Sequence, residues 1–274
     1  MALVANSLRS HFRGMCEALA SLVLPAPCRI CARILDTGSA IPFCHSCLEA
    51  LTQTLAEPLC AQCGRPIVSS AVAEGIPQPL CHICRSGVYA FDFARSFGAY
   101  SPQMSRAILL LKYGNVAPLG KWFARRLAGL VALQPHVFSA DAVVPVPLDR
   151  GRLRERGYNQ AELIAKPLAG LLGIPFRSYL LVRTRPRPNQ LRLTRRERWE
   201  TVRGAYATHQ EAQVDKLRVI LVDDVFTTGA TLDACSRALK GAGAARVVGL
   251  TVARALPITP APEAGLADHQ DLGE

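Results

Sequence analysis

Two adjacent carboxylates and a run of hydroxyl-bearing residues follow an apolar stretch late in the chain. Residues 217–222 are apolar and β-branched, which predicts a buried strand of a parallel sheet. Asp223 and Asp224 come next, and side-by-side carboxylates suit the two neighbouring hydroxyls of a sugar. The following residues open a helix and offer N–H groups and hydroxyls to a phosphate: Thr227, Thr228, Gly229, Ala230 and Thr231. The pattern predicts one ligand that carries both a sugar diol and a phosphate.

Eight cysteines in the first third of the chain form four Cys-x-x-Cys pairs. Twelve residues separate the first two pairs, and seventeen separate the last two. Two such pairs make a tetrahedral thiolate site with no position open for water, so we expect two structural zinc ions. The spacing allows a sequential or an interleaved pairing. In the simpler, sequential pairing, one ion is bound by Cys28, Cys31, Cys44 and Cys47, and the other by Cys60, Cys63, Cys81 and Cys84.

Positive charge is concentrated between Arg150 and Arg198. This segment holds thirteen basic and three acidic residues in a chain of net charge +11. Twelve of the thirteen are arginine, whose planar guanidinium recognises phosphate and carboxylate through paired hydrogen bonds. The segment therefore predicts an anionic ligand or nucleic acid as a partner.

The elements that must position these residues alternate between strand and helix. Such alternation predicts an α/β domain with a mainly parallel sheet flanked by helices, preceded by the small cysteine-rich zinc-ribbon module. From periodicity we expect further strands at 91–100, 141–147 and 246–252, and helices at 103–113, 158–172 and 230–239.

The length of 274 residues, half of them hydrophobic, predicts about two domains. We expect an amphipathic segment at 1–24, a double zinc ribbon at 25–88, the α/β domain at 89–256 and a disordered tail at 257–274. No stretch approaches the ~20 apolar residues of a membrane helix, and no secretory signal pattern is present. These features predict a cytoplasmic protein without a membrane span, in which reduced thiols favour zinc over disulfides.

Residues 222–231 resemble the 5-phosphoribosyl 1-diphosphate signature of type I phosphoribosyltransferases. Residues 111–114, 144–147 and 152–161 are similar to blocks of the ComF family, whose members carry a cysteine-rich zinc module ahead of a transferase-like domain. The resemblance covers most of residues 28–254 and implies a type I phosphoribosyltransferase-like fold. Because the family is associated with natural transformation, it also implies single-stranded DNA and DNA-uptake proteins as partners.

By that resemblance, Asp223 and Asp224 bind the ribose hydroxyls of 5-phosphoribosyl 1-diphosphate, or of a related ribosyl phosphate, and residues 227–231 bind its 5-phosphate. The diphosphate and its Mg²⁺ are expected near the loop after Val146. Four basic side chains are candidates to hold them: Lys112, Arg152, Arg154 and Arg156.

The block that contains these arginines leaves several roles open. Its three arginines stand at every second position before Gly157, which suits an extended loop with two charges on one side. Asn159 and Gln160 suit either a ligand or the neighbouring loop, and Tyr158 suits either packing under the loop or stacking on a base.

Two departures from the resemblance bear on catalysis. Thr227 stands where some purine transferases carry a titrating carboxylate, and Thr201 stands where the family has Asn. Two hypotheses follow. In one, the protein is a phosphoribosyltransferase, acting in DNA uptake or nucleotide metabolism. In the other, it is a non-catalytic module that binds single-stranded DNA or docks a partner. The sequence identifies neither the phosphoribosyl acceptor nor the oligomeric state.

Overall fold

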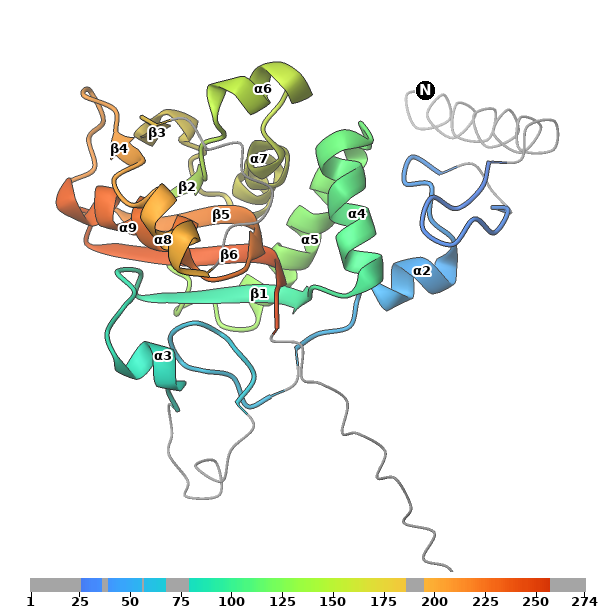
Figure 1. Ribbon diagram of the computed structural model, residues 1–274, viewed down its shortest axis with the longest axis horizontal. Helices are drawn as coiled ribbons and strands as arrows, with labels where there is room; N and C mark the ends of the chain where they lie inside the picture. Colours follow the sequence, from blue (N-terminus) through green and yellow to red (C-terminus); the bar gives the residue numbers. More distant parts are fainter. Residues whose placement is uncertain (1–25, 36–38, 56, 68–78, 186–194, 257–274) are drawn as a thin grey trace, which may run out of the picture.

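The computed structural model describes residues 26–35, 39–55, 57–67, 79–185 and 195–256 (Figure 1). The amphipathic segment expected at 1–24 and the tail expected at 257–274 lie outside the described residues. Within the described part of the chain, no helix combines the length and the apolar character needed to cross a membrane.

A parallel sheet of four strands forms the centre of the fold, in the order β1-β6-β5-β2. The expected α/β class with a mainly parallel sheet is therefore confirmed. The last two strands extend beyond the predicted ends, and β5 includes Asp223 and Asp224, which were expected to follow it. The bounds are β1 (Phe93–Ala99), β2 (Ala142–Pro145), β5 (Arg218–Phe226) and β6 (Arg246–Arg254).

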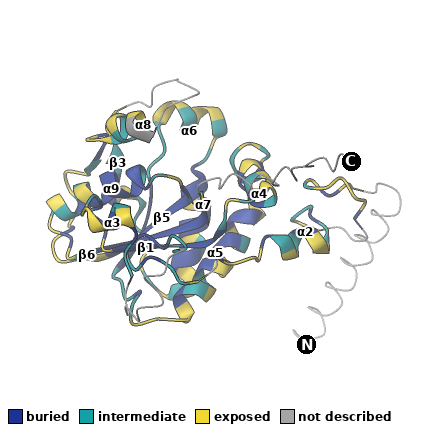
Figure 2. Ribbon diagram, turned by 60° about the horizontal axis from the view of Figure 1, so that its bottom comes forward, coloured by how far each residue is buried: buried dark blue, intermediate teal, exposed yellow. Residues whose placement is uncertain are grey.

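Helices cover both faces of this sheet because its strands alternate between two hydrophobic cores. Ile220 and Val222 of β5 join the core under α4, α5 and α7, whereas Val219 and Leu221 join the core under α9. Figure 2 shows the buried strands between helices whose outer faces are exposed. The bounds are α4 (Pro102–Tyr113), α5 (Pro118–Ala132), α7 (Gln160–Leu172) and α9 (Ala230–Gly241).

A second, smaller sheet lies beside the main one. It consists of two antiparallel strands, β3 (Leu181–Arg183) and β4 (Tyr206–Thr208), with the short helix η2 (Ser178–Leu180) before it. Helix α8 (Arg195–Val202) precedes β4, and helix α6 (Arg150–Arg156) follows β2. Figure 1 shows α6, β3 and β4 on the side of the main sheet away from α3. Trp199 of α8 packs near Tyr89, with ring centroids 5.8 Å apart.

The two cysteine-rich segments dock at separate places (Figure 1). The first contains α2 (His45–Ala50) and lies next to α4, and the second contains α3 (His82–Arg85) and lies beyond β1. Each of these short helices begins directly after the first cysteine of a Cys-x-x-Cys pair.

Candidate functional site

A cavity of about 230 Å³ lies at the carboxyl ends of β2 and β5, the edge where open α/β sheets bind ligands. Five parts of the chain line it: the end of α4, the loop after β2 with α6, the start of α7, the end of β5 with the start of α9, and the small second sheet with α8. The predicted site residues in its lining are Lys112, Arg152, Arg156, Asp223, Asp224, Thr227, Thr228, Ala230 and Thr231. Gly229 and Arg154 are not part of this lining.

The paired carboxylates at the end of β5 are both buried but have different surroundings. Successive strand side chains point to opposite faces, so Asp224 faces α4 and Asp223 faces α9. The Nζ atom of Lys112 lies 2.6 Å from Oδ2 of Asp224. Lys112, which was expected near the diphosphate, is therefore paired with Asp224. An oxygen of Asp223 accepts a hydrogen bond of 2.8 Å from the backbone N–H of Asp224.

Asp223 has a strongly perturbed acidity. Burial, with the neighbouring charge of Asp224 as the second cause, raises the pKa of Asp223 from 3.8 to about 8. Its carboxyl group is therefore mostly protonated at neutral pH, where it can donate as well as accept a hydrogen bond.

The loop between β5 and α9 presents hydroxyls and free helix N–H groups to the cavity. Gly229 precedes α9 in a left-handed conformation, with φ of +84°, and provides no capping side chain. The N–H of Ala230 donates a 3.3 Å hydrogen bond to the hydroxyl of Thr228, and the next N–H groups of the first turn of α9 stay available to an anion. From outside the cavity, the hydroxyl of Tyr89 donates a 2.8 Å hydrogen bond to the carbonyl of Thr228, which holds the loop in place.

The arginines after β2 lie on a helix, so the extended loop predicted from their alternation is wrong. Asp149 caps α6 by accepting hydrogen bonds from the backbone N–H groups of Gly151 and Arg152. On a helix, positions four apart share a face, which places Arg152 and Arg156 together at the cavity. Arg154 lines a neighbouring groove instead.

Two of the open roles in this block are settled by contacts. The side chain of Asn159 caps α7 and donates to the carbonyl of Val146 at 3.0 Å, so it binds the neighbouring loop. The hydroxyl of Tyr158 donates to the carbonyl of Leu111 at 2.6 Å, which is a packing role. Gln160 lines the cavity and accepts a 2.8 Å hydrogen bond from Arg156.

Several residues of the site were not predicted from the sequence. Asp149, Arg183 and Tyr206 line the cavity, and Tyr89 holds the loop between β5 and α9 from outside the cavity. Arg183 was counted within the basic segment, but no spacing rule separates it from the other arginines there. Thr201, which stands where the family has Asn, also lines the cavity.

The eight cysteines form two groups, each suited to a zinc ion. Within each group the four sulfur atoms all lie within 4.8 Å of one another. The Sγ atoms of Cys31 and Cys44 are 3.6 Å apart, and those of Cys63 and Cys81 are 3.7 Å apart. Zinc–sulfur bonds of ~2.3 Å in a tetrahedron require about 3.8 Å, so the geometry fits. The groups follow the sequential pairing, which the spacing had left open.

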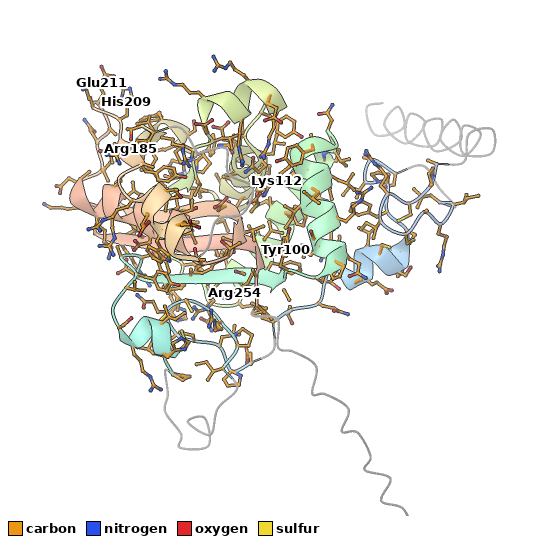
Figure 3. All side chains as sticks on the ribbon, viewed as in Figure 1. Tyr100, Lys112, Arg185, His209, Glu211 and Arg254 are labelled. Carbon is orange, nitrogen blue, oxygen red and sulfur yellow. The ribbon has the colours of Figure 1, made fainter. Side chains whose placement is uncertain are left out.

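The second cysteine group is built into the core of the α/β domain. All four of its cysteines are buried, and they share a hydrophobic cluster with Tyr89, Phe91 and Phe226. Arg254 lies at the end of β6 (Figure 3) and is 1% exposed. Its guanidinium donates to the carbonyl and the sulfur of Cys63. Burial lowers the pKa of Arg254. The nearby thiolates of a zinc site would supply the negative charge that a buried guanidinium requires.

The first cysteine group is more exposed and is attached through α4. The backbone carbonyl of Arg29 accepts a 3.2 Å hydrogen bond from Arg106, and the Arg29 guanidinium donates to the carbonyl of Gly114. Cys28 and Cys47 are buried in the core under α4, whereas Cys31 is exposed. The two groups therefore differ in how far their cysteines are enclosed.

Comparison with known proteins places this site in a wider context. The family model for the phosphoribosyl transferase domain matches residues 159–263. The DNA utilization protein YhgH of Salmonella typhi is 31% identical over 229 residues, which cover 82% of this chain and 96% of that protein. Competence protein F of Haemophilus influenzae is 29% identical over 221 residues, 78% of this chain and 90% of that protein.

A third relative comes from another bacterium. Competence protein ComFC of Bacillus subtilis is 27% identical over 215 residues, which cover 77% of this chain and 83% of that protein. Since the Salmonella relative is more than 30% identical and is covered almost from end to end, the resemblance expected from the motifs is confirmed, and the chain belongs to the ComF family.

Proposed function

We propose that the cavity binds 5-phosphoribosyl 1-diphosphate together with Mg²⁺. The observation that carries the proposal is that one cavity collects three kinds of group: a buried carboxylate pair, an uncapped helix start with hydroxyls, and two arginines on one helix face. Each kind suits a different part of this ligand, which carries a diol, a phosphate and a diphosphate.

The ribose hydroxyls are assigned to the carboxylate pair. A mostly protonated Asp223 offers both a donor and an acceptor, while the charged Asp224, held by Lys112, offers acceptors. Thr227, Thr228 and Thr231 supply hydroxyls to the 5-phosphate at the start of α9.

The diphosphate is assigned to Arg152 and Arg156. The Arg156 guanidinium is held by hydrogen bonds to the hydroxyl of Tyr113 and to Gln160, so it is already oriented before the ligand arrives. For Arg152, the structure gives no hydrogen-bond or ion-pair partner of the guanidinium among the described residues, which leaves it free for an anion. Charge-assisted bonds from arginine to phosphate are among the stronger hydrogen bonds in proteins.

Mg²⁺ requires few protein ligands at such a site. It keeps several waters and is held mainly by substrate phosphates with one or two carboxylates, so the oxygen atoms that line this cavity fit it. When bound, the ion neutralises charge on the departing diphosphate. Lys112 holds the Asp224 carboxylate on the cavity side of β5, so the chain itself positions one oxygen atom that can bind Mg²⁺.

A reaction at this site is a phosphoribosyl transfer. A nucleophile of the acceptor bonds to the anomeric carbon while the bond from that carbon to the diphosphate oxygen breaks, and the diphosphate leaves with the electron pair. Because Thr227 cannot titrate, the chain contributes positioning and charge stabilisation. The relatives' names support a role in DNA utilization or competence. Within that role we propose single-stranded DNA and DNA-uptake proteins as partners. We place this activity in the cytoplasm, where thiols stay reduced and available to zinc.

Calorimetric titration of 5-phosphoribosyl 1-diphosphate with Mg²⁺ into the zinc-loaded protein tests the proposal. We expect saturable binding that is lost in the double variant Asp223→Asn/Asp224→Asn and retained in Glu162→Gln, a control that removes an exposed carboxylate from α7. Equal binding by the wild type and the double variant would overturn the assignment. Release of diphosphate on addition of an acceptor separates turnover from binding alone.

A further inference from the structure

Arg183, the last residue of β3, lies where two hollows of the surface meet. It lines the ribosyl cavity and also an adjoining groove of about 620 Å³. In the small sheet it is paired directly with Tyr206 of β4, so the position of its backbone is fixed.

The guanidinium of Arg183 is oriented by contacts that leave one of its nitrogens unused. Its Nε donates to the carbonyl of Arg185 at 2.9 Å, and its Nη1 donates to the hydroxyl of Tyr206 at 2.6 Å. The charge centre lies 5.0 Å from the centroid of the Tyr206 ring. In the described structure Nη2 is buried and has no hydrogen-bond partner. Because an unsatisfied buried donor costs free energy, this arrangement indicates a site for an acceptor atom from a ligand.

The groove next to Arg183 is strongly basic. Its described lining includes Arg150, Arg154, Arg185 and His209, and Figure 3 shows the last two near each other beside the small sheet. Asp149 is the carboxylate in this lining, and one of its oxygens is engaged in capping α6. The excess of positive charge favours a ligand with more than one negative charge, since phosphate esters carry up to two charges at neutral pH.

We propose that Arg183 and this groove form a second phosphate-binding site, which receives an acceptor that carries a phosphate ester. The acceptor role rests on the proposed function, because it requires a phosphoribosyl donor in the adjoining cavity. The phosphate site itself does not. The shared chemistry is a nucleotide phosphate, which is present both in a mononucleotide and at the end of a DNA strand.

Titration of thymidine 5′-monophosphate and of thymidine into the zinc-loaded protein tests the second site, with and without 5-phosphoribosyl 1-diphosphate and Mg²⁺. We expect the monophosphate to bind at least tenfold more tightly than thymidine. Arg183→Gln is expected to bind the monophosphate at least tenfold more weakly than the wild type. Arg154→Gln/Arg185→Gln is expected to bind it severalfold more weakly. This second variant changes only side chains that line the groove, so it tests the site without altering the pairing of β3 with β4. Arg125→Gln, an exposed arginine on α5, serves as the matched control and should bind like the wild type.

Separate outcomes distinguish this proposal from the proposed function. Equal binding of thymidine and its monophosphate, or wild-type affinity in both groove variants, would overturn the second site. Loss of monophosphate binding with 5-phosphoribosyl 1-diphosphate binding unchanged within twofold supports it. If the ribosyl ligand fails to bind the wild type, the proposed function fails while the monophosphate titration still decides the second site. A 5′-phosphorylated thymidine decamer that binds tenfold more tightly than both the monophosphate and the same decamer without its 5′-phosphate identifies a strand end as the source. Equal affinity of the phosphorylated decamer and the monophosphate identifies the mononucleotide.

Discussion

Gly229→Ala is the substitution for which the structure predicts a combined cost in stability and binding. The residue has φ of +84°, and a Cβ atom built on it would lie 2.7 Å from ring atoms of both Phe226 and Tyr89. Tyr89 cannot move easily, because it stacks on Phe91 with ring centroids 4.6 Å apart and its hydroxyl bonds to Thr228. Phe226 is 1% exposed, and the guanidinium carbon of Arg254 lies 4.0 Å from its ring centroid.

Two contributions set the expected magnitude. A left-handed conformation costs an alanine roughly 1–2 kcal/mol relative to glycine. Forcing an extra carbon into a packed core costs about 1–3 kcal/mol. The free energy of unfolding should therefore fall by about 2–5 kcal/mol. Gly173→Ala is the matched control, because Gly173 has φ of +66° but a Cβ atom added there would have no neighbouring atom within 4 Å, so it incurs only the first contribution.

Urea unfolding of both variants, followed by circular dichroism and tryptophan fluorescence, measures this difference. Trp199 lies 5.8 Å from Tyr89 between ring centroids, so its fluorescence reports on the region around Gly229. We also expect weaker binding of 5-phosphoribosyl 1-diphosphate in Gly229→Ala and unchanged binding in Gly173→Ala. Equal losses of unfolding free energy in the two variants would refute the reasoning, since they would show that the rings move aside at little cost.

Three further predictions concern the zinc groups, the ion pair and the acid at the site. Cys60→Ser and Cys31→Ser should each release about one zinc per chain in a metal assay. Cys60→Ser should lower Tm more than Cys31→Ser, because Cys60 is fully buried and Cys31 is exposed. Equal decreases in Tm would contradict this. Lys112→Met should destabilise the protein by about 1–3 kcal/mol in urea by leaving the buried charge of Asp224 unpaired, and adding Asp224→Asn should recover part of that loss; no recovery argues against the pair. Because the folded-state pKa of Asp223 is raised to about 8, unfolding free energy should decline from about pH 4 to about pH 8, and Asp223→Asn should flatten the decline; parallel pH curves would reject the shift.

The two cysteine groups and the place of the carboxylate pair at the sheet edge were predictable because their signals are local. Cys-x-x-Cys pairs bring two sulfur atoms together whatever the rest of the fold does, and a carboxylate pair after an apolar run marks the ligand edge of a parallel sheet. No local signal distinguishes the sequential from the interleaved pairing of the cysteines, because the pairing depends on how the segments between the Cys-x-x-Cys pairs fold back.

The helical form of residues 150–156 was missed although its signals were present. Asp149 is a good N-cap, and Gly157 ends the helix in a left-handed conformation with φ of +77°. The alternation of the three arginines, which suits an extended loop, points the opposite way from these end signals. By contrast, nothing near Tyr89 or Arg183 in the sequence indicates a role, because Tyr89 bonds to a residue 139 positions away and Arg183 reaches the site only through the pairing of β3 with β4.

The place of β1 in the sheet has a consequence for how the chain is made. In the described sheet β1 pairs only with β6, and Cys63 receives its hydrogen bonds from Arg254, 191 positions later. During synthesis the amino-terminal part of a chain emerges first, yet here β1 has no strand to pair with, and Cys63 lacks its hydrogen bonds from Arg254, until β6 has left the ribosome. Closing such long-range contacts is slow, so this domain completes its fold only after β6, its last strand, has been synthesised.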